Sequence, residues 1–348
     1  MAYTDIDDPS AYFQTALYNG TGGSHSITNT GNSDLQPDWV WVKSRSASVD
    51  HELFDSVRGA GKALISNGNY AESSGRGVNS FDSDGFSLVN AQGATNDSGR
   101  TYVGWNWKAN GAGSANTDGS INSTVSANTT SGFSIVSYTG TGSNATIGHG
   151  LGAVPKMIIT KALGATNSWG IYHASLGNDK YLYLDSTQAA LSATAMWNDT
   201  TPTSSVFSVG TSGASNASGA MIAYCFAEKT GYSKIGSYTG NGNADGSFIY
   251  TGFKPAWLLI KRSDASTERW VILDSKRDTF NVSNKAVYAD DSQAENPSTS
   301  EQGLDILSNG FKIRNSNTKT NTSGATYIYM AFAEAPLVGS NNVPCTAR

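Results

Sequence analysis

The sequence predicts an all-β protein made of tandem β-sandwich domains of the jelly-roll or lectin-like type, in three related copies. Two observations support this prediction. Apolar residues alternate with polar ones, or run in short blocks between Gly, Asn, Asp and Ser clusters, as strands and turns do. The motif Ser-Tyr-Thr-Gly-x-Gly also occurs twice, in Phe133–Gly142 and in Tyr232–Gly242, with a fainter echo in Ala16–Gly22. The repeat length of about 100 residues is that of a domain rather than of a solenoid unit.

Two strands stand out in each copy. The first starts at a proline and ends at a lysine, and the second follows a Ser-Gly pair. The first strands start at Pro37, Pro155 and Pro255, and the second strands follow Ser98, Ser218 and Ser323. Successive side chains of a strand point to opposite faces, so the tryptophans of Trp39–Val42 share one face and the valines share the other. Tyr327–Phe332 carries large apolar side chains on both faces, which predicts a strand buried on both sides.

The repeat divides the chain into six expected segments. They are an N-terminal arm (1–9), three sandwich repeats (10–111, 132–230 and 231–336), a linker (112–131) and a C-terminal tail (337–348). The small residues of 112–131 are typical of a flexible linker, although Ile121 and Val125 leave a short pairing strand open. A linker there would let the first repeat hinge, whereas the other two would pack rigidly. We expect both ends to be extended arms that contact neighbouring proteins in an assembly.

Composition and charge exclude several classes of protein. The chain has 23 Lys and Arg against 28 Asp and Glu, with no basic cluster, which argues against a nucleic-acid partner. No apolar run reaches the length of a membrane span, and the start of the chain lacks the pattern of a signal peptide. Cys225 and Cys345 are expected to stay unpaired in a reducing cytoplasm.

Two motifs contain residues that could bind a metal or act in catalysis. Neither motif is kept in all three repeats. Asp82-Ser-Asp-Gly85 resembles the start of a calcium loop, but its counterparts lack the carboxylates, so turn formation explains it better. An Asp-Ser-x-Arg pattern occurs at Asp55–Arg58 and at Asp274–Arg277. It fits either a general base held by an arginine or an ion pair at a strand end. The second copy has His173 there, which favours the structural interpretation.

The remaining candidates are the tryptophans. The four histidines have no metal-ligand spacing, so we expect no metal. Together with the two motifs above, this predicts no catalytic residue and no cofactor, and a protein that is not an enzyme. Trp169, Trp197 and Trp270 lie in more polar surroundings than the tryptophans of the repeated strands. Because an aromatic face can pack on a sugar ring, these three are the predicted glycan-binding residues.

Four segments together resemble a known group of proteins. They are Pro37–Arg45, Leu53–Gly59, Ser80–Leu88 and Tyr102–Ala109. This combination resembles virion proteins of tailed bacteriophages, particularly those of marine bacteria, which are described as structural, fibre-like or lectin-like. The resemblance implies a virion component that is made in the cytoplasm of the host bacterium, and it supplies no catalytic residues.

The leading expectation is a non-enzymatic structural protein of the virion, serving as capsid decoration, as a knob or fibre, or as a tail adaptor. Its expected partners are other virion proteins, held through the terminal arms, and further copies of itself, with a trimer as the first choice. One alternative is a host-attachment adhesin that binds cell-surface glycan. A polysaccharide depolymerase is the other. We expect no nucleic-acid and no membrane partner.

Overall fold

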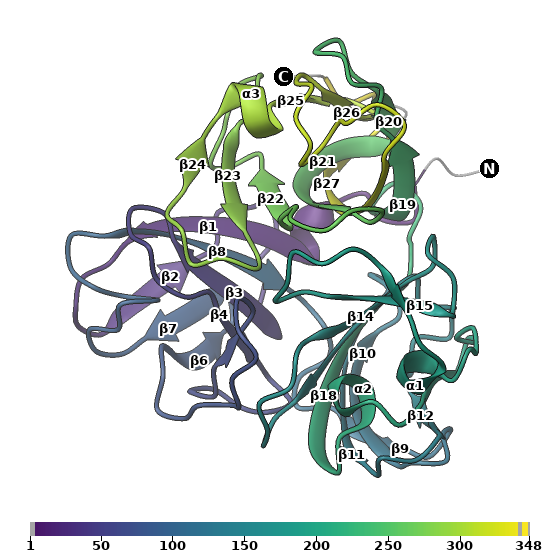
Figure 1. The fold of residues 1–348 in the computed structure, drawn as a ribbon. Helices are drawn as coiled ribbons and strands as arrows, with labels where there is room; N and C mark the ends of the chain where they lie inside the picture. Colours follow the sequence, from purple (N-terminus) through teal and green to yellow (C-terminus); the bar gives the residue numbers. More distant parts are fainter. Residues whose placement is uncertain (1–3, 340–342, 347–348) are drawn as a thin grey trace.

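The fold is built almost wholly from antiparallel strands, as a computed structural model shows for residues 4–339 and 343–346 (Figure 1). Three large sheets dominate it. The first has the strand order β1 (Phe13–Asn19), β8 (Thr101–Trp107), β3 (Trp39–Ser44), β4 (Glu52–Asp55) and β5 (Leu64–Ile65). The second has the order β16 (Leu191–Ser192), β15 (Lys180–Tyr183), β14 (Gly170–His173), β13 (Met157–Ala162), β18 (Gly219–Phe226), β11 (Phe133–Gly140), β10 (Ser123–Asn128) and β9 (Ser114–Asn116). The third has the order β19 (Ser233–Thr239), β27 (Thr326–Pro336), β21 (Phe253–Arg262), β22 (Val271–Asp274), β23 (Lys285–Tyr288) and β24 (Asn296–Pro297).

A small sheet covers the outer face of each large one. The small sheets are β2 (His25–Thr28), β7 (Gly85–Leu88) and β6 (Val78–Asp82); β12 (Ala145–Gly148) and β17 (Val206–Val209); and β20 (Phe248–Tyr250), β26 (Gly310–Ile313) and β25 (Leu304–Leu307). The helices are single turns: η1 (Pro9–Ala11), α1 (Thr194–Trp197), α2 (Gly213–Asn216) and α3 (Thr299–Gln302). In the described residues, no helix is long and apolar enough to cross a membrane. The predicted all-β sandwich fold is confirmed.

The connections follow the same order in the three large sheets. In the first, the strand that leads into the Gly-x-Gly turn, β1, pairs with the last strand, β8, and β8 pairs in turn with the strand that carries the proline-led motif, β3. The same holds for β11, β18 and β13 and for β19, β27 and β21. We call the segments that contain β1–β8, β9–β18 and β19–β27 the first, second and third parts.

The segment 112–131 is not a flexible linker. Its strand β10 pairs along its whole length with β11, and β9 pairs with β10, so the segment forms one edge of the second large sheet. The small residues serve close packing: a Cβ added to Gly119 would lie 2.4 Å from the carbonyl oxygen of Thr146. The open alternative, a pairing strand near Ile121 and Val125, is the one observed, and the predicted hinge at this point is wrong.

Each large sheet is buried on both faces. In β3, Trp39 and Trp41 belong to a core shared by the whole molecule, whereas Val40 and Val42 belong to a local core under the first small sheet. The predicted separation of the two faces is therefore confirmed. Every residue of Tyr327–Phe332 is at most 4% exposed, as predicted for a strand buried on both sides.

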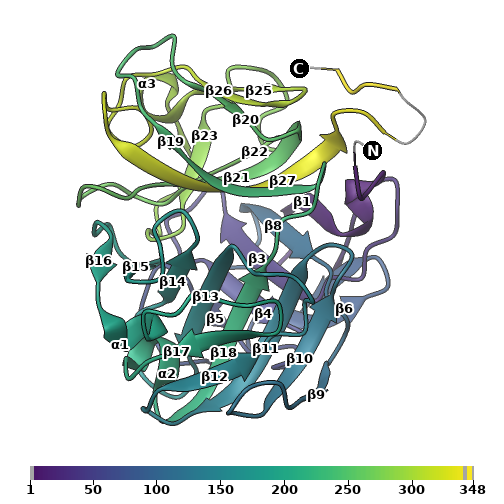
Figure 2. The same cartoon turned by 90° about the vertical axis from the view of Figure 1, so that its right-hand side faces the viewer.

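The shared core lies where the three large sheets face one another, between the three lobes of Figure 1 and Figure 2. Phe332 of β27 has its ring centroid 5.7 Å from that of Trp107 in β8 and 6.0 Å from that of Phe226 in β18. These three rings stand at matching positions, since each pairs with the residue two positions after the proline of the proline-led motif: Trp39, Met157 and Trp257. Each large sheet therefore contributes an aromatic ring from the corresponding position to the shared core.

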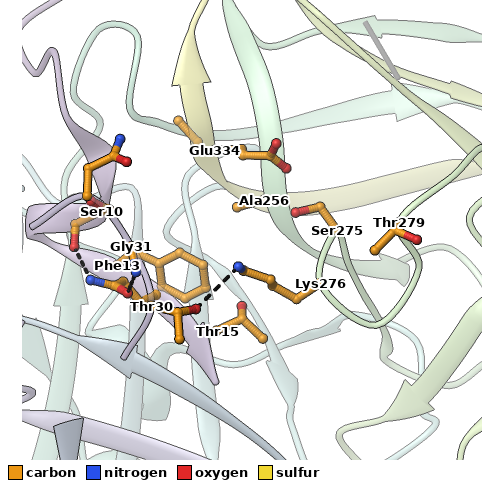
Figure 3. Close-up of a pocket in the computed structure, with 13 residues that line it drawn as sticks. Ser10, Phe13, Thr15, Thr30, Gly31, Ala256, Ser275, Lys276, Thr279 and Glu334 are labelled. Atoms are coloured by element: carbon orange, nitrogen blue, oxygen red, sulfur yellow. Dashed lines mark hydrogen bonds between the residues drawn. The ribbon is translucent and has the colours of Figure 1, made fainter. Parts of the chain in front are cut away.

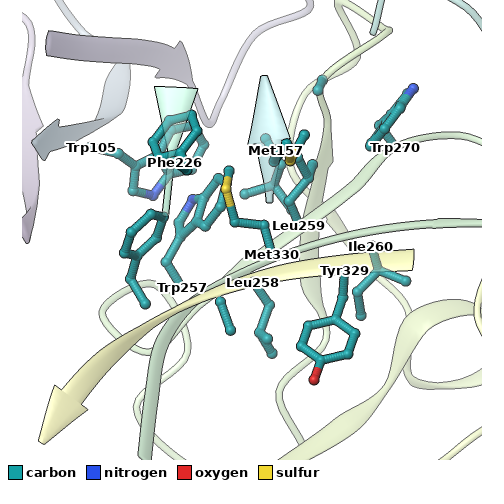
Figure 4. Packing of buried hydrophobic residues seen from close by; sticks show 14 of the residues in the cluster. Trp105, Met157, Phe226, Trp257, Leu258, Leu259, Ile260, Trp270, Tyr329 and Met330 are labelled. Atoms are coloured by element: carbon teal, nitrogen blue, oxygen red, sulfur yellow. The ribbon is translucent and has the colours of Figure 1, made fainter. Parts of the chain in front are cut away.

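Figure 4 shows how the third sheet separates its two faces. Trp257 and Leu259 of β21 point toward Trp105, Met157 and Phe226 of the other parts, together with Met330 of β27. Leu258, Ile260 and Tyr329 point the other way. The ring of Tyr329 there lies 5.4 Å from that of Phe311 in the third small sheet. Large aromatic side chains bury roughly 150–250 Å² each, so the shared core contributes a large part of the apolar burial that stabilises all three sheets.

The repeated Gly-x-Gly turn has a steric cause. A Cβ on Gly140 would lie 2.1 Å from the carbonyl oxygen of Ala217, and Gly142 has a φ of 69° that other residues rarely adopt. The buried Asn216 closes the turn, because its Oδ1 accepts a hydrogen bond from the backbone N–H of Thr141 at 2.9 Å. Asn96 and Asn321 accept the corresponding bonds from Thr21 and Asn241 in the other parts.

The described part of the predicted N-terminal arm packs against the body of its own chain. The backbone N–H of Asp5 donates to the carbonyl oxygen of Thr230 at 3.0 Å, and Ile6 is 4% exposed. At the other end, Cys345 donates its backbone N–H to Leu337 at 3.0 Å, so the described tail folds back on itself. Residues 1–3, 340–342 and 347–348 of the predicted arms lie outside the described residues.

The shared core makes one tryptophan important for the whole molecule. Replacing Trp257 with Ala removes a fully buried indole that contacts rings of the first part, so we expect the free energy of unfolding to fall by about 3–5 kcal/mol in chemical denaturation. The matched control is Tyr70→Ala, which removes a ring that is 55% exposed and should cost about 0.5 kcal/mol or less. A loss below about 1 kcal/mol for Trp257→Ala would contradict the shared core.

Candidate functional site

The contacts between the large sheets, which we call seams, contain the most unusual side chains of the molecule. Three lysines, Lys43, Lys161 and Lys261, lie at the end of the proline-led strands and are 0% exposed. Lysine is seldom fully buried unless its ammonium is paired. Here the partners are backbone carbonyl oxygens, and part of each set comes from a neighbouring part of the chain.

Lys43 shows the arrangement at the seam between the first and third parts. Its Nζ donates to the carbonyl oxygens of Ser44 at 2.9 Å and Val49 at 3.0 Å, within its own part. It also donates to Ser292 of the third part at 3.1 Å. Lys161 reaches across to Asn69 of the first part at 3.3 Å, and Lys261 reaches Thr187 of the second part at 3.3 Å. The three contacts run in the same direction around the molecule and close a ring.

A backbone hydrogen bond accompanies each lysine at a constant offset. The acceptor is the carbonyl oxygen of the residue two positions after the lysine. The donor is a backbone N–H of the neighbouring part, three positions after the residue that the lysine contacts there. The three bonds are Glu295 to Arg45 at 2.9 Å, Glu72 to Leu163 at 2.8 Å and Ala190 to Ser263 at 2.8 Å. Burial lowers the pKa of each of the three lysines to about 8, so each ammonium is still charged at neutral pH.

The predicted glycan-binding tryptophans belong to the seams and the cores, not to the surface. Trp169, Trp197 and Trp270 are at most 1% exposed, so no aromatic face is open to a sugar, and the prediction is wrong for all three. Trp169 donates its Nε1–H to the carbonyl oxygen of Ile65 at 2.8 Å, and Trp270 donates to that of Tyr183 at 2.9 Å, each across a seam. Trp197 lies in the local core of the second part.

The Asp-Ser-x-Arg pairs are ion pairs at strand ends, as the structural interpretation predicts. In the first, Asp55 accepts hydrogen bonds from both the backbone N–H and the guanidinium of Arg58, and in the second Asp274 does the same for Arg277. Each carboxylate also accepts from the next part. Tyr224 donates its hydroxyl to Asp55 at 2.7 Å, and Trp105 donates its indole N–H to Asp274 at 3.0 Å. Both carboxylates are at most 1% exposed, whereas a general base must reach a substrate.

His173 takes the corresponding place in the second part. Its Nδ1 accepts from the backbone N–H of Ser175 at 3.2 Å, so the ring proton belongs on Nε2, which faces the carbonyl oxygen of Tyr329 in the third part at 3.3 Å. Burial lowers the pKa of His173 to about 4 and keeps the ring neutral. All three seams thus use this position for a cross-part contact, with different side chains.

A pocket of about 360 Å³ opens at the seam between the first and third parts (Figure 3). Hydroxyl groups, the Lys276 ammonium and the Glu334 carboxylate line it. Lys276 approaches the Thr30 hydroxyl at 3.5 Å, while Glu334 pairs with Lys254 at 2.9 Å. Such a lining can hydrogen-bond a small polar molecule. It offers one carboxylate, whereas glycoside hydrolysis uses two that face each other.

The carboxylates of the calcium-like turn accept hydrogen bonds from neighbouring protein groups. Asp82 accepts from Ser80 at 2.7 Å and from Ser87 at 2.5 Å, and Asp84 accepts from the backbone N–H of Leu35 at 3.1 Å. Across residues 4–339 and 343–346, no three His, Cys, Asp or Glu side chains are grouped as a metal ion would require. The turn links β6 to β7, which is the role that the sequence predicts for it.

The seam lysines are the residues that the sequence analysis missed. Their signal was visible, because each proline-led strand of the repeat ends in a lysine. A lysine at a strand end is ordinarily solvated, so its position alone gives no reason to expect burial. The buried Asn of the Gly-x-Gly turn was missed for the same reason, although it stands two residues before Ser-Gly in all three parts.

A family model for a domain of unknown function, DUF7483, matches residues 8–336. The chain belongs to this family. The DUF7483 match runs through all three large sheets as one unit, as the closed ring of seams does. No curated protein and no solved structure matches the chain.

The seam lysines predict a specific pH dependence. The ordinary pKa of lysine is 10.5 and burial lowers that of Lys161 to about 8, so between these values the unfolded chain binds a proton that the folded chain has lost. Stability from this group therefore rises with pH over that window. We expect Lys161→Met to flatten the rise, by at most about 1.4 kcal/mol per pH unit, in denaturant unfolding measured from pH 7.5 to pH 9.5.

The exposed Lys180 provides the control for this measurement. Lys180→Met should leave the slope of stability against pH as it is in the wild-type chain. An identical slope for Lys161→Met and Lys180→Met would contradict a titrating buried ammonium at the seam.

Proposed function

We propose that the chain is a non-enzymatic structural component of a tailed-phage virion, built from three related sandwich copies closed into a ring. The place on the particle is capsid decoration, a knob or fibre, or a tail adaptor. One observation carries the proposal: the buried lysine and its neighbouring backbone bond recur at all three seams with the same offsets. Three copies of one domain, packed by one type of contact, would produce this pattern.

The use of the buried charges supports a structural role. The side chains that could perform acid–base chemistry, Asp55 and Asp274, each hold an arginine of their own part and a donor from the next part. Removing either partner would leave a buried charge uncompensated. Such groups fix the position of one sheet on another. A rigid body of this kind suits a particle component that displays a surface and bears load.

Attachment to other virion proteins is the second element of the proposal. The two described ends contact the chain at the start of the third part and within it: Asp5 accepts from the backbone N–H of Thr230, in the connection that leads into β19, and Cys345 contacts Ser308. Ends that share one side of the body can anchor it and leave the opposite side exposed. A homo-oligomer, with a trimer as the first choice, would place several such bodies around one anchoring point.

A host-attachment adhesin is the second candidate, and a specific observation favours it. Phe248 and Tyr250 are 47% and 58% exposed on one face of β20. Exposed apolar side chains that lie side by side, unlike single ones, are typical of surfaces that bind a ligand.

The structural role is tested on purified particles. We expect mass spectrometry of gradient-purified phage to find the chain at a fixed copy number, and cryo-electron microscopy to show a three-lobed body at its position. Detection of the chain only in the particle-free fraction of the lysate would contradict the proposal. Release of fragments from host capsule by the purified chain would contradict its non-enzymatic part.

Deletion of residues 1–9 tests the anchoring. The truncated chain should still give a cooperative unfolding transition but should be missing from particles. Since Ile6 and Pro9 are buried, this folding control is essential. Particles that carry the truncated chain at the wild-type level would contradict anchoring through the N-terminal segment.

A further inference from the structure

Strand β20 exposes two aromatic rings at the edge of the third small sheet. β20 pairs with β26 on one side only. Its side chains alternate, so that Ile249 is 6% exposed while Phe248 and Tyr250 are 47% and 58% exposed. Eight large apolar side chains are exposed in the described part of the chain, and these two alone share one face of one strand.

Comparison with the other small sheets shows that folding does not require these rings. In all three sheets an isoleucine lies opposite a phenylalanine: Ile27 and Phe86, Ile147 and Phe207, and Ile249 and Phe311. The positions that flank this isoleucine hold Ser26 and Thr28 in the first sheet, and Thr146 and Gly148 in the second. The sandwich thus forms with small or hydroxyl-bearing residues at these positions. The two aromatic residues of the third sheet need another explanation.

A pocket of about 380 Å³ adjoins Tyr250. It lies between the connection from β18 to β19 and the turn from β20 to β21, and Tyr250 forms part of its wall. The ring of Tyr250 lies close to Gly252, where a Cβ would be 3.7 Å from the phenol oxygen. The rest of the lining comes from polar residues and glycine, with Thr230, Lys229 and the ion pair of Lys234 with Glu228 at 3.3 Å among them.

The combination suits a sugar chain better than a protein partner. The face of an aromatic ring carries partial negative charge and attracts the polarised C–H groups on one side of a sugar ring. Hydroxyl, ammonium and carboxylate groups can bond the hydroxyls at the edge of that sugar. Residues 248 and 250 are about 7 Å apart along the strand, so the two rings can contact successive sugars. A stable protein interface needs roughly 800 Å² from each partner, far more than two side chains and a small pocket provide.

We propose that Phe248, Tyr250 and the adjoining pocket form a binding site for the polysaccharide of a bacterial surface, with the rings as a platform and the pocket taking the neighbouring sugar. The proposal rests on the adhesin candidate and is independent of where the chain sits on the particle. The proposed glycan site thus lies on the exposed face of β20 in the third part, and not at the buried tryptophans.

The test exchanges the aromatic residues for those of the first small sheet. The full chain and the double variant Phe248→Ser, Tyr250→Thr are applied to an array of bacterial capsular and lipopolysaccharide glycans. We expect the full chain to bind at least one polysaccharide and the variant to bind it at least tenfold more weakly. Tyr70→Ser, which removes an exposed ring elsewhere, is the matched control and should bind like the full chain. Equal unfolding curves for all three chains exclude misfolding as the cause.

The substitution Lys229→Gln tests the pocket separately, because it leaves the rings of Phe248 and Tyr250 unchanged. We expect at least threefold weaker binding, and unchanged binding would remove the pocket from the site. Absence of binding to every polysaccharide, or equal binding by the full chain and the double variant, would overturn the proposal. Copy number in purified particles gives a separate readout, because the double variant should still be incorporated if the structural role holds.

Discussion

The buried ammonium groups of Lys43, Lys161 and Lys261 are the constraint on which the rest of the structure depends. Each takes a charge out of water, which is costly unless several acceptors replace the lost hydration. The acceptors are carbonyl oxygens of the lysine's own part and one from the next part. A sheet that moved away from its neighbour would leave that ammonium short of an acceptor in an apolar setting. Each seam is therefore tied to the correct docking of two sheets, and three seams close the ring.

This constraint explains why the large sheets are buried on both faces. One face of each sheet needs only its small sheet, as in an ordinary sandwich. The other face carries large rings such as Trp107, Phe226 and Phe332, which would be exposed in an isolated part. A part taken alone would therefore expose a wide apolar surface and an uncompensated lysine. The three sheets therefore form one body, and a single family model covers all of them, at residues 8–336.

The sequence was sufficient for local features and insufficient for contacts between parts. Alternation predicted the two faces of Trp39–Val42 and the double burial of Tyr327–Phe332, because a strand's pattern lies within a few residues. The composition of 112–131 predicted a flexible linker, and this was wrong. The small residues there allow Gly119 to pack closely against β12. Trp169 and Trp270 were misjudged because their polar neighbours in sequence say nothing about carbonyl groups that lie 104 and 87 residues away. Only a comparison of the three seams reveals the role of the lysines.

Residues that recur in the three parts and residues that differ between them have different roles. Shared residues lock sheets together, while the outer surface is free to vary, as β20 does. The central claim is that the three sheets fold as one cooperative unit, and scanning calorimetry tests it most directly. For a single unit, the ratio of the calorimetric to the van't Hoff enthalpy of unfolding should be about 1. A ratio near about 3, or separate transitions for the three parts, would contradict the claim.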